Sequence, residues 1–424
     1  MSDLIDELRW RGLIQQHTDI EALSEALDSG SVTFYCGFDP TAPSLHHGHL
    51  IQLIVMRHLQ NAGHKPLALV GGATGLIGDP RDVGERTMNP TEVVEDWAAR
   101  LKRQIEPFLD FEGDNPARIV NNYDWTADVS AIELLRDIGK YFRLGTMIAK
   151  DTVARRLASE DGISYTEFSY QILQANDFLE LFKQYGCTLQ TGGNDQWGNL
   201  VGGVDLIRKA EGKSVHVMTT PLITKADGTK FGKTEGGAVW LDPTMMSPYD
   251  FYQFWLQTSD EDVMRMVKAF TFLSHEQIEE LEAATQERPH VRAAQKALAA
   301  AVTRLVHGEE ELQQVLRATD ALWGKGDLWE IEGATLEAAT KNLPHGAITL
   351  GDSTVVDAVV ACGLEKGRQA ALRLVKSNGL SINNVKIDDP DRVLTEKEVL
   401  PGGMILLRKG RRTLAAVRAD RETV

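Results

Sequence analysis

The chain has 424 residues, of which 42% are hydrophobic, 25% charged and 7% aromatic. These values are ordinary for a folded chain of two or three domains, and they exclude collagen-like, low-complexity and wholly disordered proteins. The net charge of −16 argues against a protein that coats nucleic acid with its whole surface. No apolar stretch approaches the roughly 18 residues that a membrane span needs, so we expect no membrane association.

The start of the chain and the cysteines indicate a cellular compartment. The segment MSDLIDELRWRG carries acidic residues and lacks the long apolar core of a signal peptide. The three cysteines, Cys36, Cys187 and Cys362, show neither metal-ligand spacing nor a disulfide framework. We therefore expect a cytoplasmic protein without a metal site of its own.

The first part of the sequence alternates short apolar segments with amphipathic ones. A β-rich segment ends at the turn residues Asp39-Pro40, and a continuous apolar run precedes Gly71-Gly72. This alternation predicts a Rossmann-like α/β domain with a doubly wound parallel sheet. In chain order, we expect strands over 32–38, 66–70 and 118–121, and helices over 48–62 and 91–108.

The rest of the chain divides into further segments. A helical region follows, then a strand–turn–helix unit and one more strand, and later a long helical stretch before a small α/β module. From Gly351 onward the chain has 13 Lys+Arg and 10 Asp+Glu, a net charge of +3, which hints at a module that meets a polyanion. The predicted domains are the Rossmann-like domain over 1–225 with a helical insertion, an α-helical domain over 226–323, a linker over 324–352 and the small module over 353–420.

A cluster of histidines follows the first predicted strand. His46 and His49 flank Gly48 where a strand end passes into a helix start, and such a helix N-terminus attracts anions. Both histidines could donate hydrogen bonds to a phosphate whose charge grows during a reaction. Histidines exposed at a helix start would produce the same pattern. A zinc site is disfavoured because no third and fourth ligands lie nearby in the sequence.

Glycine-rich and polar segments recur at other predicted strand ends. The run from Gly71 to Pro80 is neither a P-loop nor a G-x-G-x-x-G motif. Tyr170, Gln174 and Asp177 share one helix face by their spacing. They are followed by a polar segment over 190–199 and by a lysine-rich loop over 225–234, which could close over a polyphosphate. Taken singly, each segment could also be an ordinary surface feature.

Together these segments resemble the bacterial tyrosyl-tRNA synthetases, a family of class I aminoacyl-tRNA synthetases. His46-His-Gly-His49 is similar to the HIGH signature of that family, and Lys230-Phe-Gly-Lys-Thr234 is similar to its KMSKS loop. The strings YCGFDPT, GGATGLIGDP and GGNDQWGN match in family order. The module around residues 364–384 is similar to an S4 RNA-binding domain. The resemblance covers essentially the whole chain.

The resemblance implies a two-step reaction. Tyrosine attacks the α-phosphate of ATP to form tyrosyl-adenylate and pyrophosphate, and the tyrosyl group then passes to the 3′ end of tRNA(Tyr). Magnesium is expected to accompany ATP as part of the substrate. The implied catalytic residues, which act on the phosphates, are His46, His49, Lys230, Lys233, Thr41 and Arg86. The implied nucleotide contacts are Gly37, Asp39, His46, Gly48, His49, Gly193, Asp195 and Lys233.

The resemblance also implies the amino-acid pocket and the RNA contacts. Tyr35 and Asp177 would meet the phenol group of tyrosine, whereas Asp79, Tyr170, Gln174 and Gln196 would bind its ammonium and carboxylate side. In the S4-like module the expected RNA contacts are Lys366, Arg368, Arg373 and Lys376. The helical region before it is expected to meet the anticodon arm. A homodimer is expected, with residues 131–150 as its contact.

Three departures from the family pattern stand out. His47 replaces the apolar residue of HIGH, and we expect its side chain to point away from the nucleotide. Phe231 and Gly232 replace Met and Ser of KMSKS. Residues 80–84 lack the lysine of some relatives, which leaves open which basic residue there contacts pyrophosphate. Two alternatives are weaker: a tryptophanyl-tRNA synthetase, and a catalytically inactive RNA-binding relative.

Overall fold

The computed structural model describes residues 3–80, 84, 88–229, 231–232, 237–410 and 413–420. It contains two compact units, one formed by residues 1–245 and 258–298, the other by residues 246–257 and 299–424. No helix in the described ranges combines the length and apolar composition that crossing a membrane requires.

The first unit is built on a six-stranded sheet in the order β1-β6-β5-β2-β3-β4. All neighbouring strands are parallel except β1 and β6, which pair antiparallel. The strands are β1 (Gln16–His17), β2 (Thr33–Phe38), β3 (Lys65–Val70), β4 (Arg118–Asn121), β5 (Cys187–Gly193) and β6 (His216–Thr220).

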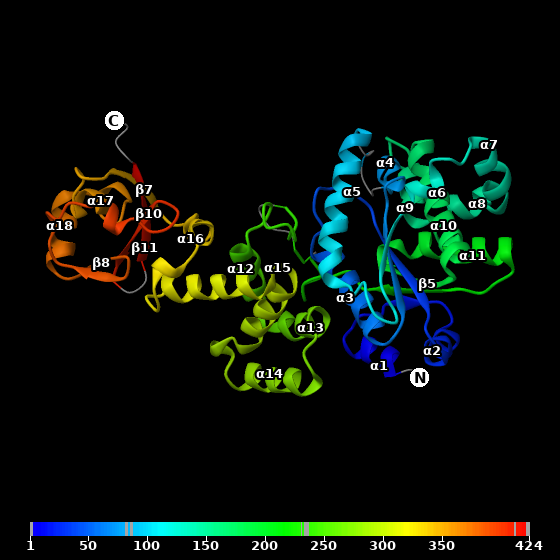
Figure 1. Cartoon of the computed structure of the whole chain (residues 1–424), viewed down its shortest axis with the longest axis horizontal. Coiled ribbons are helices and arrows are strands. Elements are labelled where there is room, and N and C mark those ends of the chain that lie inside the picture. Colours follow the sequence, from blue (N-terminus) through cyan, green and yellow to red (C-terminus); the bar gives the residue numbers. More distant parts are fainter. Residues whose placement is uncertain are drawn as a thin grey trace. The chain divides into compact units, whose positions relative to one another are not determined.

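Helices cover both faces of this sheet, because its parallel strands need crossover connections. Helices α3 (His47–Asn61) and α5 (Thr91–Ile105) lie on one face, and α10 (Tyr165–Tyr185) and α11 (Trp197–Glu211) lie on the other (Figure 1). Side chains on the second face form one apolar core, in which Tyr35 and Leu67 of the sheet pack with Phe178 and Leu206 of the helices. The predicted doubly wound α/β fold is confirmed.

The first unit contains further helical elements, some of which cap the sheet while others form an insertion between β4 and β5. These are α1 (Asp3–Trp10), α2 (Ile20–Ser29), α4 (Thr74–Ile77), η1 (Glu106–Phe108), α6 (Tyr123–Thr126), α7 (Ala131–Glu133), η2 (Leu134–Ile138), η3 (Gly139–Tyr141), α8 (Leu144–Ile148), α9 (Asp151–Leu157), η4 (Asn194–Gln196), α13 (Asp260–Phe270), α14 (His275–Glu287) and η5 (Pro289–Val291).

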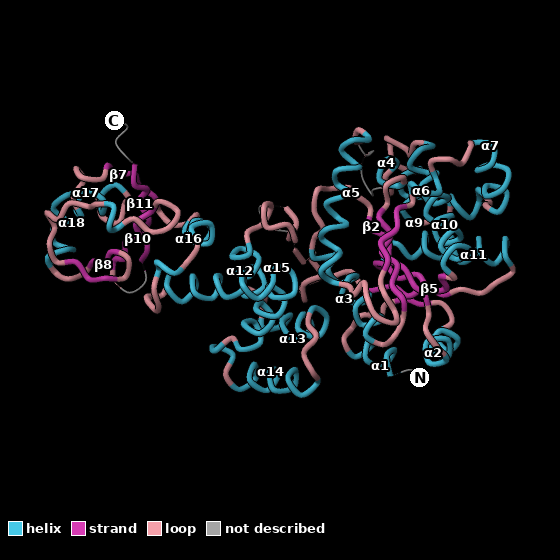
Figure 2. Tube along the Cα trace, viewed as in Figure 1, coloured by secondary structure: helices cyan, strands magenta, loops and turns pink. Residues whose placement is uncertain are grey.

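The second unit contains a five-stranded sheet in the order β7-β11-β10-β8-β9, in which only β7 and β11 pair parallel (Figure 2). Its strands are β7 (His345–Thr349), β8 (Leu380–Ile382), β9 (Val385–Ile387), β10 (Met404–Lys409) and β11 (Thr413–Asp420). Its helices are α12 (Pro248–Leu256), α15 (Ala293–Leu322, the first residues of which belong to the first unit), η6 (Leu328–Glu330), α16 (Gly333–Thr340), α17 (Val355–Ala361), α18 (Arg368–Lys376) and η7 (Glu396–Glu398).

Most predicted elements of the first part lie where expected. The strand predicted over 118–121 is β4, and the helix predicted over 48–62 is α3, shifted by one residue. The segment 324–352, predicted as a linker, contains α16 and β7, and β7 is an edge strand of the second sheet. Glycine and proline residues in this segment indicate a linker and not a strand. In addition, its pairing partner β11 lies near the other end of the module, so no local pattern indicates the pairing. The boundaries of the four predicted domains stay a prediction.

A buried ion pair connects the insertion to α10. Arg156 of α9 and Glu167 of α10 are only 1% and 2% exposed, and their charged groups lie 2.8 Å apart. Arg156 also donates hydrogen bonds to the main-chain oxygens of Gly162 and Gly84, at 2.9 and 2.8 Å. One guanidinium therefore anchors the start of α10 and the segment before α5.

We predict that Arg156→Met lowers the free energy of unfolding by about 3–5 kcal/mol, because it leaves the carboxylate of Glu167 buried without its cation. Urea unfolding of the whole chain measures this change. The double variant Arg156→Met with Glu167→Leu should lose less than the single variant, since no uncompensated charge remains. Arg208→Met, which breaks an exposed pair with Asp205, is the control and should cost less than about 1 kcal/mol. A loss no larger for Arg156→Met than for this control would contradict the prediction.

Candidate active site

The candidate site lies at the carboxyl ends of β2 and β5. In the sheet, β3 and β4 lie on one side of β2, whereas β5 and β6 lie on its other side. The strand order therefore reverses between β2 and β5. In open parallel sheets, ligands bind outside the carboxyl ends of the strands at such a reversal. The predicted residues that follow these strands therefore meet at one place, although more than 150 positions separate Asp39 from Gly193 in the sequence.

The carboxylate of Asp39 is held from two sides. Tyr170 of α10 donates its hydroxyl to Oδ2 at 2.8 Å, and Thr74 of α4 donates to Oδ1 at 2.7 Å. Burial raises the pKa of the Tyr170 phenol well above its usual value, and the nearby carboxylate of Asp39 adds to this effect. A Cβ atom at Gly71 would lie 1.9 Å from Oδ1 of Asp39, so only glycine leaves room for the carboxylate.

Asp177 is the second carboxylate of the site, and unlike Asp39 it is fully buried. It accepts hydrogen bonds from Nδ2 of Asn122 and from Nε1 of Trp125, each at 3.0 Å. Asn122 also donates to Thr74 at 2.8 Å, so a continuous chain of hydrogen bonds joins Asp177 to Asp39. Burial raises the pKa of Asp177 to about 7, although the two donors oppose the shift.

Several buried polar atoms next to Asp177 have no hydrogen-bond partner among the described residues. They are the hydroxyl of Tyr35 and the Oε1 atoms of Gln174 and Gln190. Burial, and secondly the charge of Asp177, raise the pKa of Tyr35 well above its ordinary value, so this phenol keeps its proton. Buried polar groups are almost always paired in folded proteins. These atoms therefore favour a polar ligand that supplies their partners.

A second polar group surrounds Asp79. Gln196 donates to Oδ2 of Asp79 at 2.8 Å, and Asn199 donates to Oδ1 at 3.2 Å. Lys150 bonds Asn199 at 3.3 Å, and burial lowers the pKa of its ammonium to about 8, while the charge of Asp79 acts in the opposite direction. The arrangement places a carboxylate, two amides and a cation together, which suits a zwitterionic ligand.

The histidines are oriented by the start of α3. Nδ1 of His46 accepts a hydrogen bond from the amide of Gly48 at 3.0 Å, and Nδ1 of His49 accepts from the amide of His46 at 3.1 Å. Their rings stack with centroids 4.0 Å apart. Burial lowers the pKa of both rings, so both are neutral at pH 7. Because Nδ1 accepts in each, the proton lies on Nε2, and both rings offer an N–H donor.

Some of the other predicted residues of this site lie at or near the ends of β2 and β5, and the rest lie outside the described residues. Thr41 is exposed and donates its amide to the main-chain oxygen of Asp39 at 2.8 Å, while Gly37 lies near the end of β2. Gly193 ends β5, and a Cβ atom there would lie 2.5 Å from Oδ1 of Asp195. The predicted catalytic residues Arg86, Lys230 and Lys233 lie outside the described residues.

The sequence interpretation missed several members of the site. Thr74, Asn122 and Trp125 hold the two carboxylates, and Asn199 and Lys150 complete the group around Asp79. Asn122 could have been identified, since it directly follows the predicted strand over 118–121. The involvement of Lys150 had no signal in the sequence, because it comes from the helical insertion.

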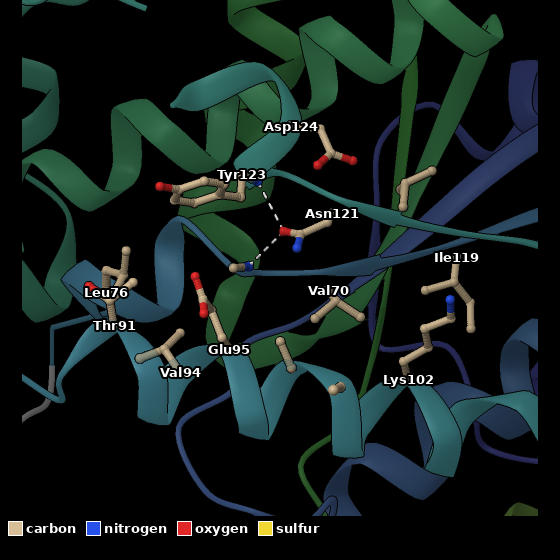
Figure 3. A pocket seen from close by; sticks show the side chains of 14 residues that line it. Val70, Leu76, Thr91, Val94, Glu95, Lys102, Ile119, Asn121, Tyr123 and Asp124 are labelled. Atoms are coloured by element: carbon tan, nitrogen blue, oxygen red, sulfur yellow. Dashed lines mark hydrogen bonds between the residues drawn. The ribbon is translucent and has the colours of Figure 1, made fainter. Parts of the chain in front are cut away.

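A groove of about 390 Å³ lies elsewhere, between α5 and the strands β3 and β4 (Figure 3). Its wall contains apolar side chains such as Val70 and Val94, and also Glu95, Asn121 and Asp124. No residue predicted for catalysis or substrate binding lines it. We therefore do not assign this groove to the active site.

The predicted RNA contacts lie on and next to α18 in the second unit. Lys366, Arg368, Arg373 and Lys376 are all exposed, as a surface that meets a polyanion requires. Arg368 forms an ion pair with Asp357 of α17, so part of its charge is balanced within the protein. The other three leave a basic surface along one end of the module.

Comparison with known proteins gives consistent results along the chain. Residues 27–324 match the family described as "tRNA synthetases class I (W and Y)", and residues 335–417 match "Tyrosine--tRNA ligase SYY-like C-terminal domain". A protein of Streptomyces avermitilis named "Tyrosine--tRNA ligase" is 57% identical over 98% of this chain and 99% of its own length. One of the same name from Streptomyces griseus is 58% identical with the same coverage. A truncated mitochondrial tyrosyl-tRNA synthetase of Aspergillus nidulans superposes with a TM-score of 0.68 at 32% identity, over 74% of this chain and 92% of that one.

The pKa of Asp177 predicts a pH effect on stability. The folded chain keeps a proton on Asp177 up to about pH 7, whereas an unfolded carboxyl loses it near its ordinary pKa of 3.8. Between these values the folded state binds more protons, so its stability falls as the pH rises. We predict that Asp177→Asn removes this part of the slope, as measured by urea unfolding between about pH 4.5 and about pH 7.5. Asp124→Asn, an exposed change nearby, is the control. Parallel curves for the Asp177→Asn variant and the unaltered chain would disprove the assignment.

Proposed function

The chain belongs to the W and Y family of class I tRNA synthetases, and we propose that it activates L-tyrosine with ATP and transfers the tyrosyl group to tRNA(Tyr). The observation that carries the amino-acid specificity is the buried Tyr35–Asp177 pair. The Tyr35 hydroxyl has no partner among the described residues, and Asp177 is fixed by two donors. The phenolic hydroxyl of a tyrosine substrate satisfies both groups.

The first step is a displacement at phosphorus. A carboxylate oxygen of tyrosine bonds to the α-phosphorus of ATP, the bond to the bridging oxygen of the β-phosphate breaks, and pyrophosphate leaves with that electron pair. In the second step, a ribose hydroxyl at the 3′ end of the tRNA attacks the tyrosyl carbonyl and loses its proton, while AMP leaves. Neither step requires a covalent bond to the protein.

The protein contributes position and electrostatic stabilisation to these steps. The neutral rings of His46 and His49 aim Nε2–H donors at the nucleotide, at the positive end of α3. Lys230, Lys233 and Arg86 add positive charge around the departing pyrophosphate, and Thr41, Gly37, Asp39, Gly48, Gly193 and Asp195 surround the rest of the nucleotide. Magnesium enters with ATP as part of the substrate.

Tyrosine binds with its ammonium and carboxylate near the second polar group. Asp79, Gln174, Gln196 and Tyr170 supply the acceptors and donors for this end. Phenylalanine would leave the hydroxyl of Tyr35 buried and unpaired, which is costly, and it would offer no hydrogen bond to Asp177. Tyrosine-specific synthetases are the general example of this effect, with a discrimination of about 10⁵. The same pair disfavours tryptophan, whose indole presents its donor elsewhere.

The second unit supports recognition of the tRNA. The exposed cations at Lys366, Arg368, Arg373 and Lys376 suit a phosphate backbone, and we assign them to tRNA contact. The division into a catalytic domain, a helical anticodon-arm domain, a connecting segment and an S4-like module belongs to the same proposal. We place the reaction in the cytoplasm, where protein synthesis uses its product.

A homodimer is part of the proposal. Ile132, Leu135, Leu144 and Ile148 are exposed by 70%, 55%, 66% and 43%, and all lie within the segment predicted as the dimer contact. A cluster of large apolar side chains at this exposure is typical of a surface that another protein covers. A second copy of the chain suits it because the dimer is a general feature of the family.

The amino-acid specificity is tested by ATP–pyrophosphate exchange. We expect exchange with tyrosine but not with phenylalanine or tryptophan at equal concentration. Asp177→Ala should reduce the exchange rate with tyrosine by at least about 10²-fold, because the pocket loses an acceptor that a buried hydroxyl needs. Exchange driven by tryptophan would indicate the other branch of the family, and no exchange with any amino acid would favour an RNA-binding protein without catalysis.

The role of α18 and its neighbours is tested by a triple variant, Lys366→Ala, Arg373→Ala and Lys376→Ala. It should keep tyrosine-dependent exchange, since these residues lie in the second unit, but it should no longer charge tRNA. The affinity for tRNA should depend less steeply on salt. The magnitude of the slope of log affinity against log salt concentration should decrease by about 0.7–0.9 for each phosphate that no longer meets a cation. A matched triple variant of exposed cations in the first unit, Lys65→Ala, Arg100→Ala and Lys213→Ala, controls for net charge. Equal effects of the two triple variants on charging would refute the assignment.

A further inference from the structure

The side chain of His47 contacts the lysine-rich loop. His47 is the first residue of α3, and its ring lies against Phe231 in an edge-to-face contact with centroids 6.0 Å apart. The ring also forms a hydrogen bond with the main chain of Phe231. The expectation that this side chain merely points away from the nucleotide therefore misses its contact with a second motif of the site.

Gly232 packs even more closely on the same ring. A Cβ atom at Gly232 would lie 2.1 Å from Cε1 and 2.4 Å from Nε2 of His47, distances that no real side chain allows. The φ angle of Gly232 is +83°, which side chains other than glycine rarely adopt. The imidazole thus occupies the space that the serine of a KMSKS loop would need.

The segment that follows the lysine-rich loop, residues 239–241, is attached to the start of α3 in a different way. The amide of His47 donates to the oxygen of Val239 at 2.9 Å, and the amide of Leu241 donates to the oxygen of Leu45 at 2.9 Å. His46 and Trp240 form an antiparallel bridge between these bonds. Main-chain bonds of this kind do not depend on the side chain at position 47. Of these attachments between described residues, the one at Phe231 and Gly232 is the one that uses the imidazole.

A histidine here has a cost that an apolar residue avoids. Nδ1 of His47 is buried and has no partner among the described residues, and such an unpaired group lowers the stability of the folded state. Since Nδ1 is unpaired, the bond to Phe231 uses Nε2. An isoleucine or leucine could fill the same volume but could not form that bond.

We propose that His47 is a positioning residue for the activation step: its ring holds the main chain at Phe231 and Gly232, the two residues that lie in the sequence between the lysines that the proposed function assigns to pyrophosphate. Gly232 is the matching half of this contact. The inference depends on the proposed function, because the lysines matter only if pyrophosphate is the leaving group. According to this inference, the reaction requires a matched pair of residues from two motifs, a histidine at position 47 and a glycine at position 232.

The test is tyrosine-dependent ATP–pyrophosphate exchange by the full-length chain, with kcat and the KM values for ATP and tyrosine determined separately. We expect His47→Leu to lower kcat/KM for ATP between about tenfold and hundredfold, as small misplacements of catalytic groups do. The KM for tyrosine should change less than about twofold, because tyrosine binds through other residues. His47→Gln should retain most of the activity, since its Nε2 can reach the place of the imidazole Nε2, whereas His47→Asn should not.

A control and a double variant make the test specific. His58 lies on the same helix, is also partly buried against an aromatic ring, Phe272, and has a buried nitrogen without a partner among the described residues. His58→Leu should leave the exchange kinetics unchanged. Gly232→Ala should be strongly impaired, and His47→Ala combined with Gly232→Ala should be more active than Gly232→Ala alone, because the clash with the ring disappears.

Three results would overturn the proposal. They are an unchanged kcat/KM for ATP in His47→Leu, an equal loss in His58→Leu, and losses of His47→Ala and Gly232→Ala that simply multiply in the double variant. Absence of exchange in the unaltered chain would refute the proposed function itself. Measuring the unaltered chain before the variants separates this outcome from the three results above.

Discussion

Two carboxylates, the partly buried Asp39 and the buried Asp177, lie where the sheet reverses its strand order, and a carboxylate removed from water must be paired. Asp39 receives hydrogen bonds from Tyr170 and Thr74, and Asp177 receives them from Asn122 and Trp125. Asn122 joins the two sets through Thr74. The chain of bonds thus connects β2, α4, the end of β4 and α10. It fixes the depth of the pocket, and the hydroxyl of Tyr35, unpaired among the described residues, then determines which substrate completes it.

The nucleotide side of the site depends on the start of α3 in a similar way. The helix needs acceptors for its first amides, and the rings of His46 and His49 provide them. In doing so both rings are held in the tautomer that presents Nε2–H outward. His47, the residue between these ring positions, faces the loop of Phe231 and Gly232 instead. One turn of helix therefore carries the two oriented histidine rings and also the contact with Phe231 and Gly232.

The two compact units carry different kinds of surface and site residues. The first unit contains the acidic and amide groups to which we assign the amino acid and the nucleotide. The second carries exposed cations on and beside α18, although the whole chain has a net charge of −16. This separation lets the protein attract a polyanion at one module without coating its surface with it. The exposed apolar side chains of the insertion, such as Ile132 and Leu144, are a third kind of surface, suited to another copy of the chain.

The sequence by itself determined the class of fold and supplied the candidate site residues, because strand–helix alternation and strand-end motifs depend on local order. The residues Tyr35, Asp177, His46 and His49 could all be chosen from such motifs. Only the tertiary structure decided what holds them: Thr74, Asn122 and Trp125 are recognised as partners once β2, β4 and α10 are brought together. The same applies to Lys150, to the pairing of β7 with β11 and to the fit between His47 and Gly232. Each is a contact between residues far apart in the chain, which no local pattern encodes.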